Sequence, residues 1–148
     1  MNHKLVKLEA GLYLVATPLG SARDITLRAL DILASADVLA AEDTRTARKL
    51  LDIHGVPLEG RRIIAYHDHS NASDRQRVLN NINEGKSVAY ISEAGTPLIA
   101  DPGYQLVRDA RQANMPVLSA PGPAACIAAL TIAAVSYTHL RAHETRLN

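Results

Sequence analysis

The sequence predicts an α/β fold: a mainly parallel five-stranded sheet with flanking helices. Two observations carry this prediction. Short apolar runs alternate with amphipathic segments along the chain, and the runs are continuous rather than every second residue. Continuous apolar strands are buried on both faces, as in parallel sheets covered by helices. The predicted strands are residues 12–17, 38–41, 62–66, 87–92 and 116–120.

A helix is predicted after each strand, and residues that favour helix starts mark the first three. Asp24 and Thr44 are the predicted N-caps of the first two helices, because their side-chain oxygens can accept hydrogen bonds from free backbone amides. Ser73 and Gln76 have the spacing of a capping box for the third helix.

The fourth and fifth helices follow proline-containing turns. Asp101 and Pro102 predict a cap followed by proline at the first helical position. The apolar stretch 124–135 is shorter than the roughly 20 residues of a membrane span. We therefore expect a buried fifth helix and no association with a membrane.

Composition fits a globular protein of the cytoplasm. The apolar fraction is 47%, and the single Cys126 excludes an intramolecular disulfide, which suits a reducing compartment. The net charge of +1 provides no overall basic field, so an RNA substrate would need a local patch of cations.

Candidate site residues are expected after the strands, because ligands of open α/β sheets bind beyond the carboxyl ends of the strands. The segment 16–20 has one glycine, which fits neither a dinucleotide-binding nor a Walker loop. The segment reads either as a plain turn or as a place where the backbone contacts a ligand. Segment 42–45 reads either as a helix start or as a site in which Arg45 holds a phosphate or carboxylate.

Two further segments follow the third and fourth strands. His67 and His69 flank an aspartate; two ligands fall short of a metal site, so we expect no metal, and the segment is either an exposed loop or a proton-handling or RNA-contacting one. Residues 93–101 form a loop longer than the usual ~2–6 residues, and long ordered loops are disproportionately functional. The turn 119–125 reads either as a ligand contact or as packing of small residues.

Five motifs in this order resemble one family. They are LYLVATPLGSARDITLRAL, AAEDTRTARKLL, YHDHS, ISEAGTPLIADPGYQLV and APGPAA. Together they resemble the small-subunit rRNA methyltransferase I group of the tetrapyrrole (corrin/porphyrin) methylase superfamily. The resemblance covers residues 10 to 133. It implies the N-terminal domain of a two-domain fold that binds S-adenosylmethionine between its domains.

The resemblance also implies an activity and its residues. It implies methylation of the 2′-hydroxyl of a cytidine in 16S rRNA of the small ribosomal subunit, by a homodimer. Asp43, His67 and Asp101 are candidate proton acceptors, and Arg45 and His69 are candidate substrate contacts. By matched position, the implied cofactor contacts are Pro18, Leu19, Glu93, Gly95, Thr96, Ala124 and Ala125.

The chain departs from the group in two places. The group usually carries Asp at the position of Glu93, which we assign to cofactor positioning. Residues 134–148 do not resemble the group and are similar to translated adaptor sequence. We therefore expect a methylase domain over residues 1–133, a foreign tail over 134–148, and no activity from this chain alone.

Two alternative functions stay open at this stage. One is a methylase of the same superfamily that acts on a corrinoid or another tetrapyrrole, although such members typically carry a glycine-richer first loop. The other is a nucleotide-binding module without catalysis.

Overall fold

The sheet of the computed structural model, which describes residues 2–99 and 103–134, contains five strands. Every pairing between these strands is parallel, which confirms the predicted α/β class. The order across the sheet is β3-β2-β4-β1-β5. The strands are β1 (Gly11–Val15), β2 (Val38–Ala41), β3 (Ile63–Ala65), β4 (Ser87–Ile91) and β5 (Val117–Ala120).

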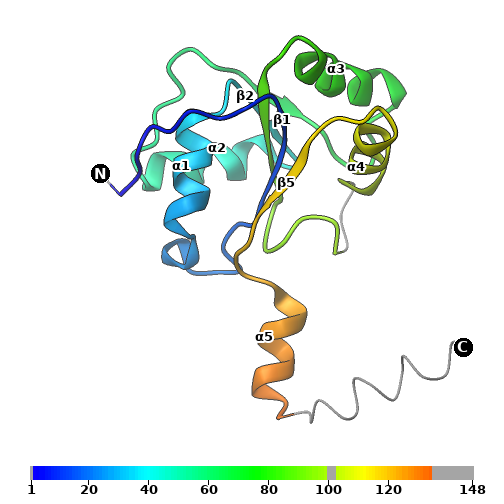
Figure 1. Cartoon of the computed structure of the whole chain (residues 1–148). Helices are drawn as coiled ribbons and strands as arrows, with labels where there is room; N and C mark the ends of the chain where they lie inside the picture. The colour runs from blue at the N-terminus through cyan, green and yellow to red at the C-terminus, as the bar shows by residue number, and fades with distance from the viewer. Residues whose placement is uncertain (1, 100–102, 135–148) are drawn as a thin grey trace, which may run out of the picture.

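Four helices cover the two faces of the sheet (Figure 1). Helices α1 (Leu27–Ser35) and α2 (Thr44–Ile53) pack on one face, and α3 (Ala72–Asn83) and α4 (Gly103–Gln112) pack on the other. Successive strand residues point to opposite faces, so Tyr90 belongs to one core and Ile91 to the other. This two-sided burial is what the continuous apolar strands predicted.

The topology of the sheet predicts a ligand crevice between its central strand, β4, and the neighbouring β1. The chain leaves β1 for α1 on one face, whereas it leaves the neighbouring β4 for α4 on the opposite face. Where adjacent strands connect to opposite faces, their loops diverge and leave room for a ligand at the carboxyl ends. The loops after β1 and β4 therefore form the geometrical centre of the candidate site.

The predicted caps of the first two helices are wrong by one or two residues. Thr26, not Asp24, caps α1, and Asp24 ends a short 3-10 turn (Ala22–Asp24) before it. Asp43, not Thr44, caps α2, and Thr44 is the first helical residue. Neighbouring polar residues cap almost equally well, so the packing of each helix against the sheet selects among them.

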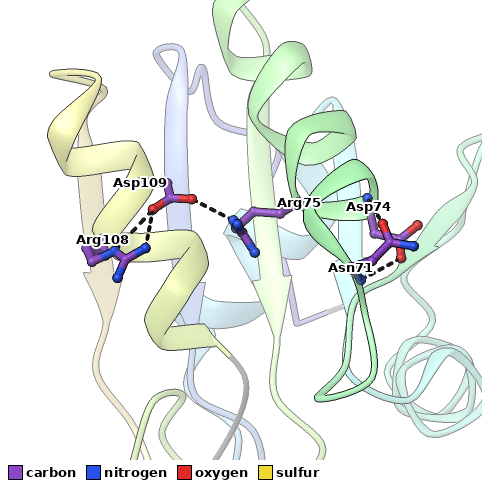
Figure 2. A network of polar contacts seen from close by, with 5 residues as sticks. All are labelled: Asn71, Asp74, Arg75, Arg108 and Asp109. Atoms are coloured by element: carbon purple, nitrogen blue, oxygen red, sulfur yellow. Dashed lines mark hydrogen bonds and ion pairs between the residues drawn. The ribbon is translucent and has the colours of Figure 1, made fainter.

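The third capping box is also displaced. Asn71 and Asp74 exchange the two hydrogen bonds that Ser73 and Gln76 were expected to make (Figure 2). The helix buries Val78, Leu79 and Ile82 in the core. The predicted cap Asp101 lies outside the described residues.

The fifth helix, α5 (Ala125–Ile132), corrects the expectation of a buried helix. It contains no buried residue, and Ile132 is 88% exposed. Figure 1 shows α5 projecting beyond the sheet, where no other described element packs on it. In the described ranges, no helix is both long and apolar enough to cross a lipid bilayer.

Candidate functional site

Backbone hydrogen bonds tie together the loops that follow β1 and β4. The amide of Thr17 donates to the carbonyl of Gly95 at 2.9 Å, and the amide of Gly95 donates back at 3.0 Å. The buried Ser92 hydroxyl donates to the same Gly95 carbonyl at 2.6 Å. The two loops therefore form one ordered unit over the crevice.

Gly95 holds the closest approach in this unit. Its φ of +80° is a conformation that other residues adopt only with strain. A Cβ added there would lie 2.8 Å from Cδ2 of Leu19. The next residue, Thr96, donates its hydroxyl to the carbonyl of Pro123 at 2.8 Å and so joins the loop after β5 to the same unit.

The first pocket lies at the exits of β2, β4 and β5. Its volume is about 320 Å³, and small residues make up half of its lining. These small residues form the floor of the pocket. They leave its backbone amides and carbonyls within reach of a ligand, because they carry no long side chains. The lining residues are Glu42, Glu93, Ala94, Gly95, Thr96, Ile99, Ala124 and Ala125.

The second pocket adjoins the first and shares Glu93 and Ala94 with it. Its volume is about 270 Å³, and it lies between the loop after β1 and one side of α2. Its other lining residues are Thr17, Pro18, Leu19, Gly20, Ala22, Thr46, Lys49, Leu50 and Ile53.

Two carboxylates line the first pocket. Oε2 of Glu42 accepts a hydrogen bond from the backbone amide of Glu93 at 3.1 Å, which anchors the β2 exit to the β4 exit. The side chain of Glu93 lines both pockets. Two anions beside one pocket favour a ligand that carries positive charge.

Asp43 and Arg45 take structural positions at the start of α2. Oδ1 of Asp43 accepts from the amides of Arg45 at 2.7 Å and Thr46 at 3.1 Å. These bonds from the Thr46 and Arg45 backbone hold the pKa of Asp43 below its usual value, which makes it a weaker proton acceptor. The side chain of Arg45 is 92% exposed and lies 3.6 Å from Asp43.

His67 and His69 follow the edge strand β3 and line neither pocket. Nδ1 of His67 accepts from the amide of His69 at 3.2 Å, and the ring centroids lie 6.0 Å apart. This bond fixes the proton of a neutral His67 on Nε2, so neither ring nitrogen offers a free lone pair. Across the described ranges, no three His, Cys, Asp or Glu side chains are grouped to hold a metal ion.

All seven predicted cofactor contacts line one or other of the two pockets, whereas the described catalytic and substrate candidates lie outside both. Sequence reasoning missed Glu42, Thr46 and Lys49. Glu42 lies in the segment 42–45, where the sequence predicts Asp43 and Arg45 as the functional residues. Lys49 gave no signal because its place beside the β1 loop depends on the packing of α2.

The fold and the site together define an α/β domain with a cation-favouring ligand crevice at the carboxyl ends of its strands. Residues 11–147 match the family model described as Tetrapyrrole (Corrin/Porphyrin) Methylases. The chain belongs to this family.

Two curated relatives are both named Ribosomal RNA small subunit methyltransferase I. The protein of Mesorhizobium japonicum is 52% identical over 124 residues, which cover 84% of this chain and 41% of the relative. The protein of Rickettsia prowazekii is 44% identical over 128 residues, which cover 86% of this chain and 45% of the relative. The chain thus spans less than half the length of these relatives.

Solved structures share the fold at lower identity. Uroporphyrin-III-C-methyltransferase from Thermus thermophilus matches with a TM-score of 0.62 and 22% identity over 86% of this chain and 53% of that one. A cobalt precorrin-4 methyltransferase matches with a TM-score of 0.64 and 20% identity over 84% of this chain and 51% of that one.

Proposed function

We propose that the protein containing this chain transfers a methyl group from S-adenosylmethionine to the 2′-hydroxyl of a cytidine in 16S rRNA. The observation that carries the proposal is the first pocket, where two carboxylates and a floor of small residues meet at the exits of three strands. Family membership supports methyl transfer, and the names of the relatives support the small-subunit rRNA substrate.

The residues of the two pockets fit the chemistry of this cofactor. Gly95 would clash with Leu19 if it carried a Cβ, so the backbone is kept open at the pocket wall. Glu42 and Glu93 suit a cationic sulfonium or a ribose hydroxyl. The contacts we propose are Pro18, Leu19, Glu93, Gly95, Thr96, Ala124 and Ala125.

S-adenosylmethionine, when bound, supplies an activated methyl group. The task of the protein is to align a ribose hydroxyl and to accept its proton. The sequence motifs predict Asp43, His67 and Asp101 as proton acceptors. Asp43, however, accepts backbone amides as the cap of α2, and Nδ1 of His67 accepts the backbone amide of His69. Glu42 also accepts a backbone amide, that of Glu93 through Oε2, but unlike Asp43 and His67 it lines the pocket, and we propose it as the acceptor.

Methyl transfer to small ribosomal subunits tests this proposal. With the product of the complete gene and labelled S-adenosylmethionine, we expect Glu42→Gln to lower kcat by about 10²–10⁴-fold, the usual contribution of a general base. Glu93→Gln should weaken cofactor binding and keep kcat at saturating cofactor. The wild type failing to methylate these subunits would refute the function.

The same assay separates the competing acceptors. If Glu42→Gln kept its turnover while Asp43→Asn or His67→Ala lost it, the role that we assign to Glu42 would be wrong although the function would stand.

We propose further that the active protein is a cytoplasmic homodimer and that this 148-residue chain alone is inactive. Binding pockets for small molecules usually have about 300–1,000 Å³ and bury most of the ligand. The first pocket, of about 320 Å³, lies at the bottom of that range. Sedimentation of the complete gene product checks the homodimer, and the methylation assay on the isolated chain checks its inactivity.

A tetrapyrrole substrate is the second candidate, favoured by the folds that match this chain. Methylation of a precorrin but not of ribosomal subunits would select it. Calorimetry with S-adenosylmethionine, ATP and NAD would reveal a nucleotide-binding module without catalysis, if binding occurs and neither substrate is methylated.

A further inference from the structure

Helix α2 carries three cations on its exposed side. Arg45, Arg48 and Lys49 are spaced three and four positions apart, which places them on one face of the helix. The opposite side of α2 packs into the core through Ala47, Leu50 and Leu51. We call Arg45, Arg48 and Lys49 the α2 ridge.

Arg48 and Lys49 of the α2 ridge have no ion pair among the described residues, and Arg45 has only a contact of 3.6 Å to Asp43, the N-cap of the helix. Asp52 lies in the last turn of α2, beyond ion-pair distance of the ridge cations Arg48 and Lys49. Such a group of cations attracts an external anion, because ion pairs among the described residues neutralise its charge only at Arg45.

The ridge adjoins the candidate site. Lys49 lines the second pocket, which shares Glu93 and Ala94 with the first. The hydroxyl-bearing Thr46 lines the second pocket from the same helix. A polyanion on the ridge therefore runs beside the second pocket, which belongs to the site that we propose for the methyl donor.

We propose that the α2 ridge binds the phosphate backbone of the RNA substrate, with Lys49 contacting a phosphate next to the nucleotide that is methylated. The inference rests on the proposed function and adds the surface that seats the RNA. A chain of net charge +1 can bind RNA in this way, because the three cations of the α2 ridge form a local basic patch.

The signs of the charges assign the two ligands to different sides. Glu42 and Glu93 repel phosphate from the wall of the first pocket and favour a cation there. The α2 ridge does the opposite on the neighbouring surface. A nucleotide whose phosphate lies at Lys49 therefore turns its ribose toward the shared wall formed by Glu93 and Ala94.

RNA is favoured over a protein partner by the composition of the surface. Centres of protein interfaces contain few charged residues overall and many aromatic ones, whereas the α2 ridge consists of three cations and no aromatic residue. Lysine, arginine and threonine hydroxyls are the groups that contact phosphate oxygens.

The test measures binding of in vitro transcribed 16S rRNA to the complete gene product over a range of salt concentrations. We expect the double variant Arg48→Ala/Lys49→Ala to raise the Kd about tenfold at low salt. Each lost contact to a phosphate should reduce the slope of log K against log salt by about 0.7–0.9. Lys49→Arg should retain the binding.

The matched control is Arg77→Ala/Arg111→Ala. It removes the same charge from exposed positions of α3 and α4, which cover the other face of the sheet. We expect wild-type affinity and salt slope from this control. Equal losses in the control and the ridge variant would mean that only net charge matters, which would overturn the proposal.

Other outcomes are equally decisive. Unchanged RNA affinity and salt slope in the ridge variant would overturn the proposal. The proposal would also be overturned if the ridge variant bound free rRNA as tightly as the wild type does but bound assembled small subunits more weakly. The ridge would then contact a ribosomal protein. Cofactor binding is measured in parallel. If the wild type did not bind the cofactor, the proposed function would be refuted. If the ridge variant bound the cofactor normally and kept the wild-type slope of log K against log salt, only the proposal for the ridge would be refuted.

Discussion

Gly95 is the residue on which the geometry of the crevice depends most directly. It combines a φ of +80° with two backbone hydrogen bonds to Thr17 and contact with Leu19. A larger residue therefore meets both backbone strain and a steric clash. Glycine at this point adopts the positive φ without strain and leaves the space that the side chain of Leu19 occupies.

We expect Gly95→Ala to lower the free energy of unfolding by about 1–3 kcal/mol, the usual cost of a residue held in a rare backbone conformation. Chemical denaturation monitored by circular dichroism measures this loss. Gly20→Ala is the control, because a Cβ at Gly20 has no atom within 4 Å. Equal unfolding midpoints for the two variants would contradict this account of Gly95.

Asp37 fixes the register between β2 and β4. Its carboxylate accepts from the amide of Ser87 at 2.8 Å and from the hydroxyl at 2.7 Å, and the Ser87 hydroxyl accepts from the Asp37 amide at 3.0 Å. These bonds, first that from the Ser87 backbone and then that from its hydroxyl, lower the pKa of Asp37. Stability from Asp37 is therefore present above the pKa of the unfolded state and lost as the pH falls through the lower folded pKa.

The free energy of unfolding of Asp37→Asn is compared with that of the wild type between pH 2 and 6. Above the ordinary aspartate pKa of about 3.9, the wild type should be the more stable protein. The difference should shrink as the pH falls below that value. A difference that stayed constant down to pH 2 would show that ionisation of Asp37 contributes nothing.

At the scale of elements, an arginine joins the two helices on one face of the sheet. Figure 2 shows Asp109 of α4 between Arg75 of α3 and Arg108 of its own helix. Nε of Arg75 donates to Asp109 at 2.6 Å, and both side chains are about one-fifth exposed. Arg75 also interacts with the side chain of the buried Tyr66, the residue before His67.

We expect Arg75→Ala to cost about 1.5–3 kcal/mol of unfolding free energy, the range for hydrogen bonds to charged groups. The variant leaves Asp109 and Tyr66 without the partner that joins them. Arg108→Ala removes the more exposed contact of 3.2 Å to the same Asp109 and should cost less than about 1 kcal/mol. Thermal unfolding of both variants checks the order, and an equal cost would contradict the bridging role of Arg75.

At the scale of the whole molecule, α5 adds apolar surface without adding to the core. Ile127 and Ile132 are 59% and 88% exposed. We expect Ile127→Ser/Ile132→Ser to leave the denaturation midpoint unchanged, because neither side chain is buried in the fold. Leu106→Ala in the core should cost about 2–5 kcal/mol and provides the comparison. A large loss in the serine variant would show that α5 packs on the domain in solution.

The candidate site was predictable in part, for reasons that differ from residue to residue. Gly95 and Thr96 could be located because they follow a continuous apolar strand, and such strand ends gather at one edge of a parallel sheet. Asp43 stays a predicted proton acceptor, and the structure adds that it caps α2; a carboxylate that caps a helix and one that faces a ligand have the same sequence signal. His67 lies outside both pockets because β3 is the edge strand.

The sequence by itself determined the class of fold, the five strands and the segments that follow them, because burial on both faces requires continuous apolar runs. Only the tertiary structure decided the strand order, the capping residue of each helix and the exposure of α5. Those features depend on contacts between segments far apart in the chain. The same is true of Glu42, which reaches the pocket only because β2 lies beside β4 and its carboxylate meets the amide of Glu93.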